Sequence, residues 1–223
     1  IRDRPGWMLL SYGKKVSVSS SLEGYPAENI VDEDARTAWV AQSNRDMEWA
    51  QVDLQRLSSI HAIQVNFDEY GANQKGAVSG VYQSYLIYAS VNGEDWSLVV
   101  DYGTKKTDTP HDYIEFEEPF KARYIKLQNK EYMVSENFSV RDLRIFGKGQ
   151  GSTPRAVNDF TVERDEADPC KARLCWEAVP DAQGYIVRYG IAGDKLYNNF
   201  QVMGENTLEI GSLNKGVAYY FTI

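Results

Sequence analysis

The chain has 223 residues, a length that favours one large domain or two modest ones. Hydrophobic residues make up 43% of the sequence and charged residues 25%, a balance typical of folded rather than disordered proteins. The formal net charge is -8, which repels the phosphates of nucleic acids, so we expect no nucleic-acid partner. No apolar run approaches the roughly 20 residues that a membrane-spanning helix needs, so no membrane span is expected.

Few residues are suited to catalysis or to zinc. His61 and His111 are the only histidines, which excludes a three-histidine zinc site. Cys170 and Cys175 are the only cysteines, so there is no disulfide framework. The sequence shows no nucleophile motif and no pair of acid and base carboxylates, so we expect a protein that is not an enzyme.

Short apolar or alternating runs, bounded by turn residues, recur along the chain without a sustained helical period, which predicts an all-β fold. In the first part a helical turn is expected near residues 26–31, and Asn92-Gly93 reads as a hairpin turn. Trp39, Trp49 and Trp96 lie within apolar runs and are predicted to be core residues. The expected strands are residues 16–21, 49–54, 61–67, 85–91, 96–100, 113–116, 122–128 and 139–146.

A Gly-, Ser- and Pro-rich stretch at residues 147–154 marks a domain boundary. Strands resume beyond it, and their short, regular spacing predicts a second β-sandwich. An alternating run at residues 218–223 is followed by no further strand, so one edge of this sandwich is expected to be incomplete. The expected strands are residues 157–163, 172–178, 184–189, 198–203, 207–210 and 218–223.

Four ordered blocks in the first part resemble the discoidin, or coagulation factor V/VIII type C, family, which includes the family 32 carbohydrate-binding modules of bacterial enzymes. The blocks are residues 27–54, 88–96, 122–127 and 140–147. The resemblance implies a galactose-binding-type jelly-roll β-sandwich of eight strands over residues 12–147.

A second resemblance is to the C-terminal part of bacterial family 43 glycoside hydrolases of the xylosidase and arabinosidase type. It is carried by residues 5–14 (PGWMLLSYGK) and 62–67 (AIQVNF). It implies that residues 1–11 lead in from an upstream catalytic domain, and that the protein is extracellular or periplasmic in a bacterium, with a cell-surface location also open. The catalytic propeller itself is absent from this chain.

The second part, residues 157–223 after a linker at 148–156, resembles a fibronectin type III domain that lacks its last strand. The spacing Leu213-x5-Tyr219-x-Phe221-x-Ile223 carries this resemblance, although Lys215 and Val217 replace the usual Pro and Thr. Tyr219 would be the tyrosine-corner residue, with its hydroxyl bonded back to the backbone. A spacer role is expected.

An acidic loop after residue 31 is a candidate calcium site. Asp32, Asp34 and Thr37 can direct oxygens inward together with the backbone carbonyls of Asn29 and Arg36, and calcium takes six to eight oxygen ligands. The resemblance adds Asp142, which is shorter than the family's usual Glu. Glu33 also stands where the family has a glycine, a residue that adopts a positive φ without strain. The alternative is a set of Asx turns without metal.

Sugar recognition needs flat ring faces and planar polar groups that project from loops. The long, glycine-rich loop 68–82 supplies such groups, and loops 22–26, 42–46 and 129–138 are expected to converge with it. The candidate ligand-binding residues are Tyr25, Arg45, Tyr70, Asn73, Tyr82 and Tyr132.

Two functions remain open from the sequence. The first is a carbohydrate-binding or targeting appendage of a polysaccharide-degrading glycoside hydrolase, with a plant-type polysaccharide or oligosaccharide as its partner. The second is a structural docking or spacer module whose loop tyrosines contact the catalytic domain and bind no free glycan.

Overall fold

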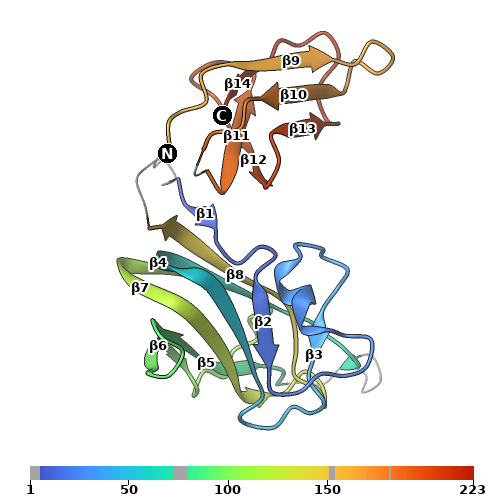
Figure 1. Ribbon diagram of the computed structural model, residues 1–223. Helices are drawn as coiled ribbons and strands as arrows, with labels where there is room; N and C mark the ends of the chain where they lie inside the picture. The colour runs from blue at the N-terminus through green and yellow to red at the C-terminus, as the bar shows by residue number, and fades with distance from the viewer. Residues whose placement is uncertain (1–5, 73–79, 151–153, 181) are drawn as a thin grey trace. The chain divides into compact units, whose positions relative to one another are not determined.

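The computed structural model describes residues 6–72, 80–150, 154–180 and 182–223. The chain divides into two compact units, Ile1–Gln150 and Gly151–Ile223. The division falls inside the expected linker, where Gly and Ser leave no side chain to bury. Each unit has its own hydrophobic core, so each is described by itself (Figure 1). Within the described residues, no helix has the length and apolar character needed to cross a membrane.

Unit 1 is built almost entirely of antiparallel strands, as predicted. A 3-10 helix, η1 (Ala27–Val31), follows β2 where the helical turn is expected. The path β1-β8-β4-β7-β5-β6 is hydrogen-bonded in that order, with β2 paired to β4 and β3 paired to β8. The strands are β1 (Met8–Leu9), β2 (Lys15–Val18), β3 (Trp39–Val40), β4 (Trp49–Phe67), β5 (Gln83–Ser90), β6 (Ser97–Tyr102), β7 (His111–Tyr132) and β8 (Ser139–Gly149).

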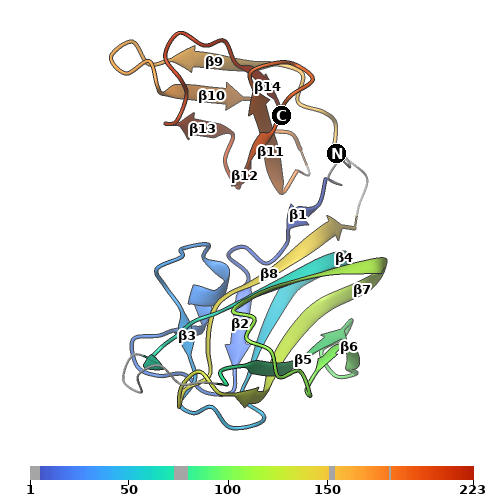
Figure 2. The same ribbon diagram turned by 180° about the vertical axis from the view of Figure 1, so that it is seen from behind.

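The strands β4 and β7 each join two segments that the sequence predicts as separate strands. Their shared ladder continues across register shifts between Asp53 and Ser58 and between Ile60 and Ala62. β-Bulges of this kind bend a strand without ending it. Gln55 takes φ 67° at the first shift, where the carboxylate of Asp53 accepts its N–H at 2.7 Å. Both strands curve through the unit in the two opposite views (Figures 1 and 2).

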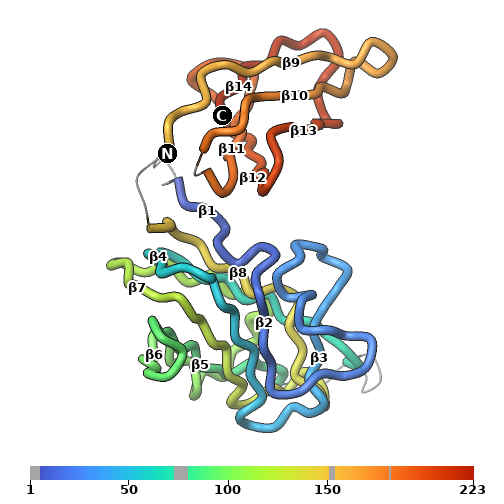
Figure 3. The backbone as a smooth tube through the Cα atoms, viewed as in Figure 1, coloured from blue at the N-terminus to red at the C-terminus, as the bar shows by residue number. Residues whose placement is uncertain are grey.

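The loops between the strands meet at one end of unit 1, which we call the loop end. Backbone bonds join Ala41 N–H to Phe138 O at 2.8 Å, Met47 N–H to Asn129 O at 3.2 Å and Asp68 N–H to Ser139 O at 3.1 Å. Segments that are distant in sequence are therefore neighbours here. Their course can be followed along the backbone tube in Figure 3.

Aromatic residues fill the core behind the loop end. Trp39 and Phe138 are fully buried and pack edge to face, with ring centroids 5.8 Å apart. The ring centroids of Phe67 and Tyr85 lie 5.3 Å apart. Trp39 is thus a core residue, as predicted. Trp49 and Trp96 are only half-buried, contrary to the prediction; Trp49 is the first residue of β4 and Trp96 lies just before β6, so neighbouring strands cover these rings only in part. Nζ of Lys126 lies 4.0 Å from the ring centroid of Trp96, a cation–π contact at the surface.

Unit 2 consists of two three-stranded antiparallel sheets, ordered β13-β10-β9 and β12-β11-β14. Leu174 and Val187 are fully buried between them. The hydroxyl of Tyr219 accepts the N–H of Asn214 at 3.1 Å, the backbone bond expected of that tyrosine, while its ring is half-buried. Membership of the fibronectin type III family stays a prediction. The strands are β9 (Phe160–Arg164), β10 (Ala172–Trp176), β11 (Gly184–Gly190), β12 (Asn198–Met203), β13 (Thr207–Ile210) and β14 (Tyr220–Thr222).

Candidate functional site

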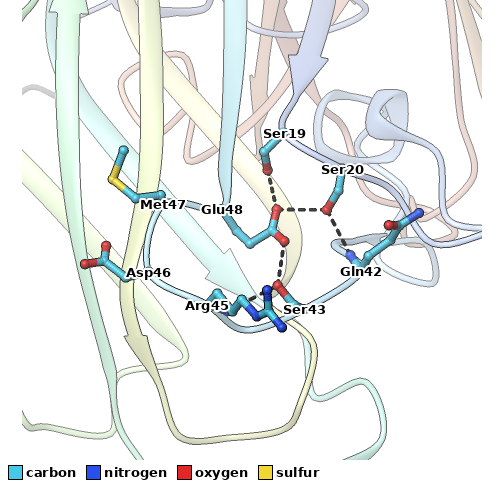
Figure 4. A pocket seen from close by; sticks show the side chains of 8 residues that line it. All are labelled: Ser19, Ser20, Gln42, Ser43, Arg45, Asp46, Met47 and Glu48. Carbon is cyan, nitrogen blue, oxygen red and sulfur yellow. Dashed lines mark hydrogen bonds between the residues drawn. The ribbon is translucent and has the colours of Figure 1, made fainter.

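A hollow of about 500 Å³ opens at the loop end of unit 1, and we call it the loop-end pocket. Two segments form it, one after β2 and one before β4 (Figure 4). Seven of its eight lining residues are polar, and they supply three hydroxyls, an amide, two carboxylates and a guanidinium. The lining residues are Ser19, Ser20, Gln42, Ser43, Arg45, Asp46, Met47 and Glu48.

The carboxylate of Glu48 organises the pocket. It accepts hydrogen bonds from the hydroxyls of Ser20 at 2.8 Å, Ser43 at 2.7 Å and Ser19. All three serines also accept backbone N–H groups, from Trp49 to Ser19 at 2.9 Å, from Gln42 to Ser20 at 3.0 Å and from Arg45 to Ser43 at 3.4 Å. Figure 4 shows the three serines pointing toward Glu48. One carboxylate therefore holds both segments of the pocket together.

These contacts also set the charge of Glu48. Burial acts to raise its pKa, but the hydrogen bonds from Ser19, Ser43 and Ser20, with the nearby charge of Arg45, outweigh burial and hold the pKa below its ordinary value. The pocket thus carries an ionised carboxylate at neutral pH. Such a group accepts hydrogen bonds from hydroxyls and amines.

The rim of the pocket presents donors to solvent. Arg45 and Gln42 are exposed, and among the described residues the guanidinium of Arg45 forms no ion pair within 4.0 Å. Asp46 instead pairs with Nζ of Lys130 at 2.6 Å. The buried amide of Asn129 donates to the carbonyls of Asn44 and Arg45 at 2.8 and 2.9 Å, which fixes the backbone that carries the guanidinium.

The predicted ligand-binding residues fall into several environments. Arg45 lines the pocket. Tyr25 and Tyr70 are half-buried and contact each other edge to face, with ring centroids 4.9 Å apart. Tyr82 is half-buried beneath Nζ of Lys106, 5.3 Å from its ring centroid. Asn73 lies outside the described residues.

Tyr132 is buried, contrary to the expectation that its ring projects from a loop toward a ligand. Its side chain is 1% exposed, and its hydroxyl donates to the carbonyl of Asp68 and lies 3.2 Å from Oγ of Ser139. The physical reason is its position at the end of β7, where the strand alternation turns the ring inward. Tyr132 anchors the start of loop 68–82 from within the core.

The expected loop 42–46 supplies four of the eight lining residues, whereas the other four lie outside the expected loops; these are Ser19, Ser20, Met47 and Glu48. Ser19 and Ser20 were assigned to a strand, but β2 ends at Val18. Glu48 stands immediately before a predicted strand, where it gives no motif. The available signal was the run of serines after β2 next to a polar loop, but only the tertiary structure shows that Glu48 meets them.

The acidic loop after η1 is closed by its own hydrogen bonds. The carboxylate of Asp32 accepts the N–H of Asp34 at 2.8 Å and the hydroxyl of Thr37 at 2.8 Å. The carboxylate of Asp34 accepts the N–H of Arg36 at 3.0 Å and two bonds from its guanidinium. The side-chain bond from Arg36 lowers the pKa of Asp34 to about 2. These bonds form the Asx turns that were the alternative to a metal site.

The predicted calcium ligand Asp142 also has a protein partner, since Asn66 donates to its carboxylate at 2.8 Å. No three His, Cys, Asp or Glu side chains of the described residues gather as a metal-holding group. The predicted site also uses Thr37 and backbone carbonyls, so calcium at this loop stays a prediction.

Glu33, which stands at the position of the expected glycine, combines a positive φ with an ion pair. It has φ 61°, the left-handed conformation that glycine adopts without cost. Its carboxylate makes two bonds to the guanidinium of Arg144 on β8, at 2.9 and 2.8 Å. The positive φ is thus retained in a non-glycine residue, and an ion pair ties the acidic loop to the sheet.

Unit 1 is therefore a β-sandwich module with a polar pocket formed by the loops at one end. The chain belongs to the F5/8 type C domain family, whose sequence profile matches residues 15–142.

Two curated relatives match part of the chain. Lactadherin from Rattus norvegicus is 33% identical over 110 residues, which cover 46% of this chain and 25% of lactadherin. Lactadherin from Mus musculus is 32% identical, over 46% of this chain and 23% of its own length. The chain thus matches about a quarter of the length of these relatives.

Solved structures show the same fold at low sequence identity. Chitosan-binding module 1 of a chitosanase/glucanase from Paenibacillus sp. IK-5 has a TM-score of 0.53 and 20% identity, over 63% of this chain and 99% of the module. The family 32 carbohydrate-binding module of C. perfringens NanJ, in complex with galactose, has a TM-score of 0.50 and 18% identity, over 63% and 98%. A fucose-binding module from Streptococcus pneumoniae has a TM-score of 0.50 and 15% identity, over 66% and 100%.

Proposed function

We propose that unit 1 is a non-catalytic carbohydrate-binding module that holds a sugar in the loop-end pocket. The observation that carries this proposal is the pocket itself, in which an ionised Glu48 and the exposed side chains of Arg45 and Gln42 surround a hollow of about 500 Å³. Sugars are recognised by carboxylates, amides and guanidinium groups of this kind, because each sugar hydroxyl both donates and accepts. The fold shared with modules that bind chitosan, galactose and fucose supports the proposal.

The biological setting is a further part of the proposal. We infer that the module is an appendage of an extracellular or periplasmic glycoside hydrolase of the family 43 type, and that it targets this enzyme to a plant-type polysaccharide. The two sequence blocks at residues 5–14 and 62–67 support this setting. Unit 2 serves as a spacer in this proposal.

The test is a glycan-binding screen of the full chain by affinity electrophoresis, followed by calorimetry, with xylan, arabinan, galactan and chitosan. We expect the variants R45A and Q42A to bind the recognised glycan about 10-fold more weakly, because each loses one or more ligand hydrogen bonds. R155A is the matched control, since Arg155 is exposed outside unit 1. Equal affinities for R45A and R155A would place the sugar elsewhere.

A second candidate function is a docking module that binds no free glycan. Two observations favour it: the rings of Tyr25 and Tyr70 pack on each other, with centroids 4.9 Å apart, and Tyr132 is buried. These rings make contacts within unit 1 and are therefore less available to stack on a sugar. The same screen separates the two functions. No binding to any of the four polysaccharides would favour docking.

A further inference from the structure

A cluster of basic residues lies on unit 1 away from the loop-end pocket. Antiparallel pairing sets Ser59 of β4 opposite Lys121 of β7 on one side and opposite Lys148 of β8 on the other. Directly paired residues of neighbouring strands have Cβ atoms about 5 Å apart and share a face of the sheet. The two lysines therefore flank one small hydroxyl residue, and both are exposed.

A stacked aromatic pair borders these lysines. The rings of Trp7 and His61 lie 4.9 Å apart at an interplanar angle of 28°. His61 stands at the register shift between Ile60 and Ala62, two residues after Ser59. Trp7 immediately precedes Met8, whose partner is Gly147, next to Lys148. We call the set Trp7, Ser59, His61, Lys121 and Lys148 the basic corner.

The positive charge of the basic corner is not neutralised within the described residues. Neither lysine nor His61 forms an ion pair there. Burial, and then the charges of Lys148 and Lys121, lower the pKa of His61, with no carboxylate acting against them. The acidic residues nearest in sequence, Glu117 and Glu118, lie in the part of β7 between Glu115 and Phe120 that the register shift leaves unpaired, and neither forms an ion pair with Lys121 or Lys148. In a chain with a net charge of -8, this local excess of positive charge favours an anionic partner.

We propose that the basic corner binds the carboxylate-bearing residues of an acidic polysaccharide, that is, its uronic acids. Lys121 and Lys148 supply charge-assisted hydrogen bonds to the carboxylate, and Ser59 supplies a hydroxyl between them. Trp7 is half-buried, so part of a flat apolar ring remains for the C–H face of the sugar. The choice of a polysaccharide as the ligand rests on the proposed carbohydrate-binding function. The position of the basic corner rests only on the strand register and the stacked rings. No residue of the corner lines the loop-end pocket.

The test is binding of polygalacturonate to the full chain, by affinity electrophoresis and calorimetry at low and at physiological salt. We expect the double variant K121Q/K148Q to bind about 10-fold more weakly, because it loses two charge-assisted bonds. K106Q/K171Q is the matched control, since it removes the same charge from two exposed lysines elsewhere and should bind as the wild type does. No binding by the wild type, or equal loss in both double variants, overturns the proposal.

Two comparisons separate this proposal from binding at the loop-end pocket and from general attraction to polyanions. R45A, which alters the pocket, should leave polygalacturonate binding unchanged while weakening binding of a neutral glycan, so the failure of one site does not imply the failure of the other. Polyglutamate tests whether a sugar ring matters. We expect it to bind more weakly than polygalacturonate and to be insensitive to W7A, and equal binding of the two polymers overturns the proposal in favour of general attraction to polyanions.

Discussion

At the scale of single residues, Glu48 links the stability of unit 1 to its proposed function. Its carboxylate accepts three serine hydroxyls from two chain segments, and the same carboxylate is exposed to the pocket those segments form. A charged acceptor that satisfies several donors is worth more than a single neutral hydrogen bond. Replacing Glu48 should therefore affect both folding and ligand binding.

We expect E48Q to lower the free energy of unfolding by about 1–2 kcal/mol at pH 7, because an amide satisfies the three hydroxyls less well than a carboxylate. The pKa of folded Glu48 is depressed, so its contribution is present above the unfolded pKa of about 4.3 and is lost as pH falls through the folded value. The measurement is urea unfolding of both proteins between pH 7 and pH 3. E94Q, at an exposed position, is the control, and a difference that does not shrink in acid would contradict the argument.

Glu33 is the second residue whose backbone and side chain act together. Its φ of 61° is strained for a residue with a Cβ, while its carboxylate pairs with Arg144. The two effects oppose each other, so the two simplest substitutions should differ in outcome.

We expect E33G to lie within about 0.5 kcal/mol of the wild type, since glycine relieves the strain while the partly exposed ion pair is lost. E33A keeps the strain and loses the pair, so it should be about 1 kcal/mol less stable than E33G. Parallel urea titrations measure both. An E33A protein as stable as E33G would show that the positive φ carries no cost here.

At the scale of elements, the long strands β4 and β7 form the framework, and loops between strands form the loop-end pocket. The acidic loop after η1 illustrates how a loop acquires a fixed shape from its own polar groups. Asp32 closes it by accepting the N–H of Asp34 and the hydroxyl of Thr37, and the Glu33–Arg144 pair ties it to β8. Hydrogen bonds of this kind hold a turn whether or not a cation is present.

We expect D32A to destabilise the protein by about 1–2 kcal/mol, because two donors lose their acceptor. Thermal melts with excess chelator and with calcium test the cause. If the hydrogen bonds alone close the loop, the loss is the same in both conditions, and the exposed-site control D159A melts like the wild type. The predicted calcium ion would be confirmed instead by a wild-type melting temperature that rises with calcium and falls with chelator, in a way that D32A abolishes.

At the scale of the whole molecule, the chain is two units with separate cores. Trp39 and Phe138 belong to the core of unit 1, and Leu174 and Val187 to that of unit 2. Among the described residues of the segment 148–156, none belongs to either core. Each core should therefore support its own folding transition.

We expect limited proteolysis to cut first within residues 148–156 and to leave two fragments that each retain a cooperative thermal transition. Mass spectrometry identifies the cut, and calorimetry of the separated fragments measures the transitions. A core substitution such as L174A should then lower the transition of the second fragment by several degrees and leave the first unchanged. A single transition that is lost on cleavage would contradict two independent units.

Local patterns in the sequence determined the all-β class, the boundary near residue 150, most strand positions and the burial of Trp39. These features depend on the alternation of side chains and on turn residues, which act over a few neighbouring positions. The same alternation predicted β4 and β7 each as two separate strands. A β-bulge interrupts the alternation of side chains without ending the strand. The half-buried Trp49 and Trp96 show the limit of the pattern, since it does not say how much of a large ring the neighbouring strands cover.

Only the tertiary structure decided which polar residues share a site. Glu48 accepts hydrogen bonds from Ser19 and Ser20, which lie nearly 30 positions earlier in the sequence. Lys121 and Lys148 are on different strands and come close because both are paired with Ser59. Tyr132 is buried rather than exposed for the same reason, because the register of β7 sets the direction of its ring. A pocket or a charged corner depends on strand register and on loop convergence, which are set by the packing of the whole unit rather than by any short stretch of its sequence.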